Sequence, residues 1–184
     1  MELKKPTKET KSVNTYKGGL PDNMYNLINS LIELEAFSSQ IYLQMAAWCD
    51  PQGFTGAAKF FRKHAEEERK HMLKHYDFLA DKNMLALTPM LKEPQSEYVD
   101  LLDIIDSAVE HEFQVSYTYE KSGEQALLEP CHQTYQHLQW YIHEQVEEES
   151  LYQTIKDKAN ILMKGGMTGL ALFELDEMLG DLAE

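Results

Sequence analysis

Four long stretches of the sequence carry apolar residues at alternating steps of three and four, the spacing that places them on one face of an α-helix. Each apolar face contains a glutamate near its middle. The four faces run over residues 24–49 around Glu35, 54–78 around Glu68, 98–119 around Glu112 and 138–162 around Glu148. The sequence therefore predicts an all-α protein whose four long helices bring carboxylates into a shared interior.

The segments between these faces predict how the helices connect. Residues 49–53 contain a proline and a glycine and predict a break and a short turn, and Gly123 and Pro130 predict a second turn. Residues 83–96 contain two prolines and no helical periodicity. Helices of about 27 residues are roughly 40 Å long, and about 14 extended residues reach roughly 46 Å. This segment can therefore cross the whole bundle, unlike the short loops of an up-down-up-down arrangement.

The two ends of the chain lie outside the four helices. Residues 1–20 are polar, rich in lysine and threonine, and have no helical periodicity, so we expect a mobile tail before one domain at 21–184. A trimmed targeting segment is the alternative for this tail. Gly165-Gly166 predicts the end of the fourth helix. Beyond it, a short amphipathic helix is predicted over residues 167–182, and we expect its apolar face to contact another subunit. The apolar residues of that face are Leu170, Phe173, Met178 and Leu182.

Composition narrows the class of partner. The chain has 17 basic and 31 acidic residues among 184, a formal charge of -14, which opposes broad contact with nucleic acid or anionic lipid and favours cations. No apolar run approaches the roughly 20 residues needed to span a bilayer. Cys49 and Cys131 are too few for a disulfide framework, so a cytosolic location is expected.

The buried glutamates point to a metal site. An ionised carboxylate in an apolar interior costs several kcal/mol, and no lysine or arginine occupies the four apolar faces. Two divalent cations would neutralise four carboxylates. Glu68 and His71 form a Glu-x-x-His pair on one helix face, and hard oxygen ligands with one imidazole suit iron.

Three segments carry a resemblance to a known family: residues 35–42 (EAFSSQIY), 64–71 (HAEEERKH) and 139–148 (QWYIHEQVEE). They resemble the bacterial-type non-haem ferritins, and the similarity covers roughly residues 21–182. The resemblance implies a ferritin-like four-helix bundle of two antiparallel hairpins and one long crossover, with a short C-terminal fifth helix. Bacterioferritins have a second Glu-x-x-His in the fourth helix where this chain has Gln145-Val-Glu-Glu148, so haem is not expected.

The resemblance also implies a ligand set for two iron ions per chain. It assigns Glu35, Glu68 and His71 to the first ion, and Glu68, Glu112 and Glu148 to the second, with Glu68 bridging the two. The following residues complete the implied site: Gln145 beside the second ion, Tyr42 in contact with the di-iron centre as a group that supports it or donates electrons, and Glu67, Glu144, Glu147 and Glu148 at a third, looser iron site.

Two further histidines, His64 and His75, fall on the inward face of the second helix. For both, a hydrogen-bonded core or supporting histidine is favoured over a metal ligand.

The function implied is iron storage and detoxification. Fe(II) would be oxidised to Fe(III) at the di-iron ferroxidase centre by O2 or peroxide, and the product stored as mineral in a cage of 24 identical subunits. One alternative is a di-iron oxidase or peroxidase of a small oligomer that stores no mineral. A second is a metal-free interaction module whose glutamates are protonated or hydrated.

Overall fold

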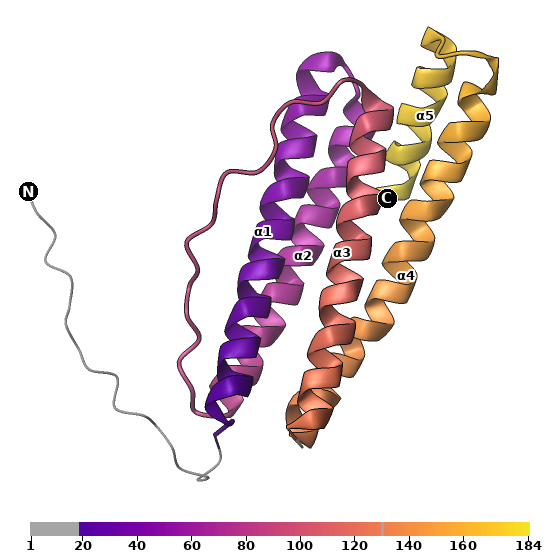
Figure 1. The fold of residues 1–184 in the computed structure, drawn as a ribbon. Helices are drawn as coiled ribbons and strands as arrows, with labels where there is room; N and C mark the ends of the chain where they lie inside the picture. The colour runs from indigo at the N-terminus through magenta and orange to yellow at the C-terminus, as the bar shows by residue number, and fades with distance from the viewer. Residues whose placement is uncertain (1–18, 130) are drawn as a thin grey trace, which may run out of the picture.

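The computed structural model describes residues 19–129 and 131–184, and its regular elements are all helical. The predicted tail lies almost wholly outside the described residues. Figure 1 shows four long helices and one short one, with these bounds: α1 Asp22–Gln52, α2 Thr55–Asp81, α3 Leu101–Leu128, α4 His132–Leu162, the single 3-10 turn η1 Met163–Gly165, and α5 Gly169–Leu182.

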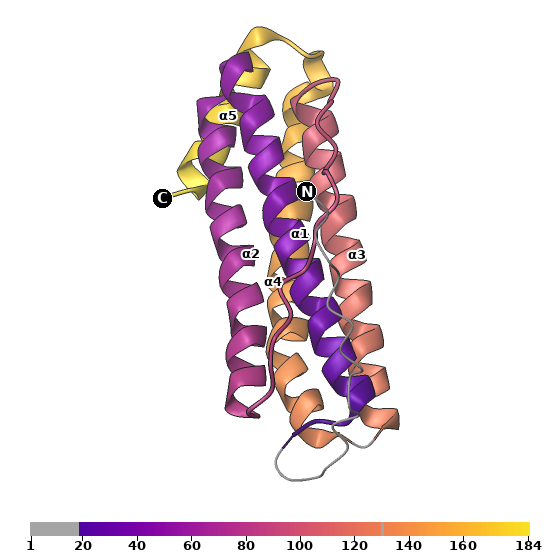
Figure 2. The ribbon, with the colours of Figure 1, turned by 90° about the vertical axis from the view of Figure 1, so that its left-hand side faces the viewer.

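The helices form two antiparallel hairpins, α1 with α2 and α3 with α4. Residues 82–100 join them in an irregular segment that runs along the outside of the bundle from one end to the other, beside α1 (Figures 1 and 2). The predicted fold class is confirmed. The crossover is longer than the sequence suggested, because α3 begins only at Leu101, where the Asp100 carboxylate accepts hydrogen bonds from the N–H groups of Leu102 and Asp103. Tyr98 precedes the helix and packs on the core.

The predicted break after Cys49 falls later than expected. α1 continues through Pro51 and ends at Gln52, and the next residue, Gly53, has φ 87°. This left-handed conformation suits glycine, which has no Cβ to clash. Gly123 also lies inside α3 rather than at its end. Among residues 19–129 and 131–184, no helix combines the length and apolar character that crossing a bilayer requires.

The apolar core is divided into two clusters by the buried glutamates. One cluster includes Met45, Phe61, Ile105 and Ile155, from all four long helices. The other includes Ile28, Leu79, Val115 and Leu138, again one from each helix. In every helix the predicted glutamate falls between its contributions to the two clusters. The four carboxylates therefore share one layer near mid-bundle, with apolar packing on both sides.

The fifth helix packs against its own bundle mainly through a face other than the predicted one, so the expected contact of the predicted face with another subunit stays a prediction. Leu175 and Leu179 are fully buried in the first cluster, while Leu170 and Phe173 remain exposed. Asp176 is also buried, and its carboxylate accepts hydrogen bonds of 3.1 and 2.8 Å from the N–H groups of Gly56 and Ala57. A negative charge is favourable at these unpaired N–H groups in the first turn of α2.

The contact between α2 and α5 should fail when Gly56 gains a side chain. A Cβ at Gly56 would lie 2.0 Å from the backbone oxygen of Asp176, which cannot rotate away. Gly56→Ala should therefore lower the free energy of unfolding by about 1–3 kcal/mol or more, despite the better helix propensity of alanine. Urea denaturation measures this. Gly169→Ala, at the start of α5 with nothing within 4 Å, is the matched control and should not destabilise.

Candidate metal centre

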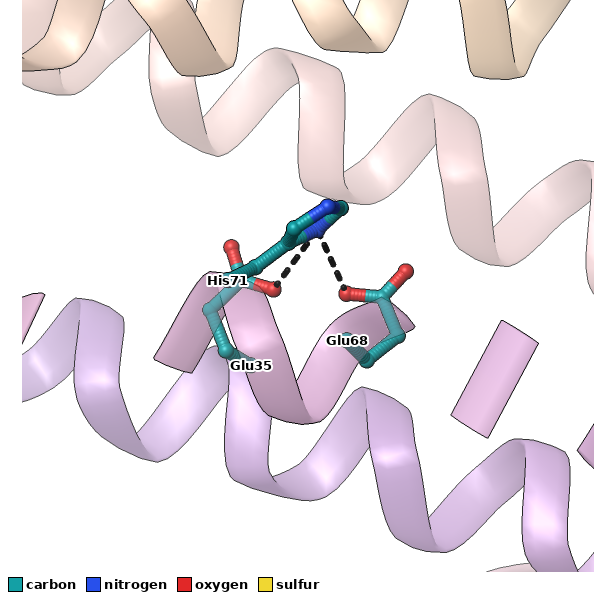
Figure 3. Close-up of side chains that lie close together, drawn as sticks. All are labelled: Glu35, Glu68 and His71. Carbon is teal, nitrogen blue, oxygen red and sulfur yellow. Dashed lines mark ion pairs between the residues drawn. The ribbon is translucent and has the colours of Figure 1, made fainter. Parts of the chain in front are cut away.

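The first group of ligands comes from α1 and α2. His71 Nδ1 lies 3.4 Å from Glu68 Oε2 and 3.8 Å from Glu35 Oε2. Dashed lines in Figure 3 mark these two contacts. One ligand atom from each of the three residues falls within 4.8 Å of the others, and all three side chains are buried. This spacing allows one cation to be bound by two carboxylates and an imidazole. The predicted Glu-x-x-His pair and Glu35 are thus brought together.

The second group comes from α3 and α4. Gln145 Nε2 donates a 2.9 Å hydrogen bond to Glu112 Oε2, so the glutamine orients this carboxylate. Glu148, one turn after Gln145, is 9% exposed. Burial, together with the nearby negative charges of Glu112 and Glu67, raises the pKa of Glu148 to about 8.

Glu68, a member of the first group, is also close enough to the second group for the charges of that group to act on it. Burial raises its pKa well above the usual range, and the negative charges of Glu112 and Glu148 act in the same direction. Glu35 shows the same shift, caused by burial and then by the charge of Glu68. These shared effects indicate that the carboxylates from both hairpins are close enough to repel one another when ionised.

Two tyrosines connect the two groups by hydrogen bonds, one in each direction between α1 and α3. Tyr42 stands seven residues after Glu35 on α1 and donates its hydroxyl to Glu112 Oε1 on α3. Tyr119 stands seven residues after Glu112 on α3 and donates to Glu35 Oε1 on α1. Each tyrosine therefore supports the carboxylate of the other helix. The prediction placed Tyr42 at the centre but did not single out Tyr119.

The residues predicted for a third site are only partly brought together. His64 Nδ1 lies 3.5 Å from Glu67 Oε2 and 3.7 Å from Glu148 Oε2, and these three atoms could bind one cation. Burial lowers the pKa of His64 to about 4, which leaves its imidazole neutral and able to bind metal. His64 was expected only as a core or supporting residue.

The remaining two glutamates of that predicted third site lie apart from His64. Glu144 Oε1 is 3.9 Å from His71 Nε2, at the edge of the first group. Glu147 is 71% exposed and faces His143 on the same helix. The predicted role of both in a third site stays a prediction.

Each of the two ligand groups contains an unpartnered carboxylate oxygen. Glu35 Oε2 and Glu148 Oε2 are buried and accept no hydrogen bond from residues 19–129 or 131–184. Every lysine and arginine in the described chain lies outside the buried set, so no fixed positive charge compensates them. A buried carboxylate oxygen without a partner is costly. The residues present therefore fit bound cations.

Sequence reasoning missed the tyrosines other than Tyr42. Tyr152, seven residues after Gln145, is 1% exposed, and its hydroxyl is unpartnered within the described chain. Its ring stacks on that of Tyr42, with centroids 5.9 Å apart. Tyr119 and Tyr152 were assigned to the apolar faces because a tyrosine ring packs like an apolar side chain. Tyr42, Tyr119 and Tyr152 each stand seven residues, two helical turns, after a buried glutamate or glutamine, and this spacing could have identified them in the sequence.

The match to the family model of the ferritin-like domain covers residues 25–161, and the chain belongs to this family. A Haemophilus influenzae protein described as a probable bacterial non-heme ferritin-like protein is 40% identical over 164 residues, 89% of this chain and 98% of its own. The bacterial non-heme ferritin of Escherichia coli O6:H1 is 34% identical, over 89% and 97% of the two chains. A novel open pore ferritin from Archaeoglobus fulgidus superposes with a TM-score of 0.83 at 32% identity, covering 88% of this chain and 96% of that one.

The pKa of Glu148 predicts how stability depends on pH without metal. Folding raises this pKa from 4.5 to about 8, so the folded protein keeps a proton that the unfolded chain has released. The stabilisation is complete below pH 4.5 and is lost as pH rises through 8. Neutral buried histidines act oppositely, but their contribution is complete by about pH 7, because unfolded histidines have a pKa of 6.5.

The free energy of unfolding of the metal-free protein should therefore fall by about 1 kcal/mol or more between pH 7 and pH 8.5. Urea denaturation at the two pH values measures this. Glu148→Gln, which cannot ionise, should reduce the fall, whereas Glu120→Gln, at an exposed position of α3, should not. A wild-type protein that is equally stable at both pH values would contradict the shift.

Proposed function

We propose that this chain is an iron-storage ferritin subunit that oxidises Fe(II) at a di-iron centre inside its bundle and works without haem. The observation that carries the proposal is the pair of unpartnered, buried carboxylate oxygens, one on Glu35 and one on Glu148. Each belongs to a different hairpin and to a different ligand group. Two cations would supply the missing partners and compensate the four glutamates together. Membership of the ferritin family and the names of the bacterial relatives favour iron.

The two iron ions enter as substrate, each held by residues with distinct tasks. Glu35, Glu68 and His71 bind the first ion. Glu68 bridges to the second, which Glu112 and Glu148 also bind. The supporting residues hold these ligands still, because Gln145 and Tyr42 both donate hydrogen bonds to Glu112. The buried glutamates that are protonated release their protons as the cations bind, since only the ionised carboxylate binds a metal.

Oxidation transfers one electron from each Fe(II), so a pair reduces O2 by two electrons to the level of peroxide, and peroxide can itself serve as the oxidant. The two Fe(III) ions then carry two more positive charges than the four carboxylates neutralise. This excess favours bridging by oxide or hydroxide from water and weakens the match between ions and site. Glu67 and Glu144, both half-buried beside the centre, extend the acidic surface along which the product leaves for mineral storage.

Loss of the bridging ligand should abolish fast oxidation. In Glu68→Ala, both ions lose a carboxylate, so the initial rate of Fe(III) formation should fall by more than about tenfold. Stopped-flow absorbance after mixing anaerobic, Fe(II)-loaded protein with O2 measures this rate. Glu66→Ala, at an exposed position two residues away on α2, is the matched control and should oxidise iron at the wild-type rate. Equal rates in both variants would place the oxidation elsewhere.

Storage requires an enclosed assembly, which we propose is a cage of 24 subunits in the cytosol. Aerobic loading should give particles of one size by light scattering, each with an electron-dense core by electron microscopy. The number of iron ions retained should far exceed the number of ligand sites. A small oligomer that oxidises Fe(II) and retains only the bound ions would instead support the alternative of an oxidase or peroxidase without mineral storage.

A further inference from the structure

A chain of buried hydrogen bonds leads away from Glu35 and is not part of the proposed ligand set. Tyr119, which donates to Glu35 Oε1, has its hydroxyl 3.0 Å from Nε2 of His75 on α2. His75 Nδ1 in turn lies 2.9 Å from Nε2 of His137 on α4. Tyr119 of α3, His75 of α2 and His137 of α4 thus form a continuous hydrogen-bonded series that starts at the Glu35 carboxylate of α1.

The surroundings of the chain hold its members rigidly. His75 is fully buried, and its ring stacks on Tyr141 with the centroids 4.2 Å apart and the planes 4° from parallel. Tyr141 also stacks on Tyr119, at 4.8 Å. His137 stacks on Phe78 at 4.0 Å and lines a surface pocket of about 260 Å³. The rings have little freedom to turn, so the hydrogen-bond geometry is fixed.

The direction of each hydrogen bond follows from the chemistry of the groups. A carboxylate bound to a cation can only accept, so Tyr119 must donate its single hydroxyl proton to Glu35. The Tyr119 oxygen then accepts from His75, whose Nε2 carries the hydrogen. Burial lowers the pKa of His75 well below its usual value and that of His137 to about 4, so both rings are neutral. His75 Nδ1 therefore accepts, and His137 Nε2 donates to it.

We propose that His75, supported by His137, is a positioning residue that holds Tyr119 as a hydrogen-bond donor to Glu35. The inference rests on the proposed function. Glu35 Oε1 is occupied by Tyr119, which leaves Oε2, the oxygen with no partner among the described residues, to bind the first cation beside His71. The chain thus selects which oxygen Glu35 presents and keeps it there.

The second ligand group is built differently. Tyr42 makes the equivalent hydrogen bond to Glu112, but within the described residues no imidazole nitrogen bonds to its hydroxyl. Two histidine rings lie beside the Tyr42 ring: His111 meets it edge-on and its Nε2 is hydrogen-bonded to Ser38, and the Nδ1 of His64 faces Glu67 and Glu148. Only the carboxylate of the first group is therefore supported by a three-residue chain. Changes in His75 should affect the first cation and spare the second.

The test measures binding of Co(II) under anaerobic conditions, since its visible absorption reports the geometry of its ligands without oxidation. His75→Leu should weaken binding of the first Co(II) by about 10- to 100-fold and change its spectrum. Tyr119→Phe, which removes the donor itself, should have a similar effect. His75→Gln keeps an amide N–H to donate toward Tyr119 and should recover most of the affinity. His132→Leu, which removes an exposed histidine at the start of α4, should bind as wild type.

A double-mutant comparison separates positioning from packing. If His75 acts through Tyr119, adding His75→Leu to Tyr119→Phe should cause no further loss of affinity. A full, additive loss in the double variant would overturn the inference, as would wild-type Co(II) affinity and spectrum in His75→Leu. If His75→Leu fails to fold, the other two variants decide. Wild-type Co(II) affinity in Tyr119→Phe would overturn the inference. A His75→Gln variant that binds Co(II) as weakly as Tyr119→Phe would also overturn it, because the imidazole would then act only by packing.

The outcomes also distinguish this inference from the proposed function. Wild-type protein that binds neither Co(II) nor Fe(II) would overturn both the inference and the proposed function. Wild-type protein that binds two Co(II) per chain and loses both in Glu68→Ala, but neither in Tyr119→Phe, would support the di-iron centre and overturn only the role of the histidine chain.

Discussion

Burying four carboxylates in one layer of a helical bundle is the constraint on which the rest of the structure depends. Glu35, Glu68, Glu112 and Glu148 are each at most 9% exposed, and the described chain buries no lysine or arginine beside them. Without a cation they are tolerated only by holding protons, which the raised pKa values express. Apolar clusters lie on both sides of the layer, and ionised carboxylates buried between them are costly unless a positive charge is near.

The same layer joins the two hairpins. The backbones within a hairpin pack closely, but the polar centre is bridged by side chains from one hairpin to the other. Tyr42 of α1 bonds to Glu112 of α3, Tyr119 of α3 bonds to Glu35 of α1, and Tyr141 of α4 donates a 2.9 Å hydrogen bond to the backbone oxygen of His71. These three hydrogen bonds each run from one hairpin to the other, so buried polar contacts as well as apolar packing hold the two hairpins together.

The two halves of the site support their ligands by different means. Glu112 receives hydrogen bonds from Tyr42 and from the side-chain amide of Gln145. Glu35 receives one from Tyr119, which is backed by two neutral histidines. An amide and a tyrosine fix both oxygens of Glu112, whereas the tyrosine fixes one oxygen of Glu35 and leaves the other for a cation. In the proposed function, the two ions would therefore be bound by carboxylates that are supported in different ways.

The sequence alone determined the four helices and the long crossover, since helical spacing states which residues share a face. It also placed six residues on the inward faces, and the structure buries all of them: Glu35, Glu68, His71, Glu112, Gln145 and Glu148. Their role as metal ligands comes from the family resemblance and stays a prediction. The sequence also placed Tyr42 near the centre. The sequence could not give the side of α5 that packs inward, because apolar residues lie on more than one of its faces and only docking on α2 selects Leu175 and Leu179. Nor could it give the partners of Tyr119, His75 and His137: they come from three helices, and only the packing of the two hairpins decides which hydroxyl meets which imidazole.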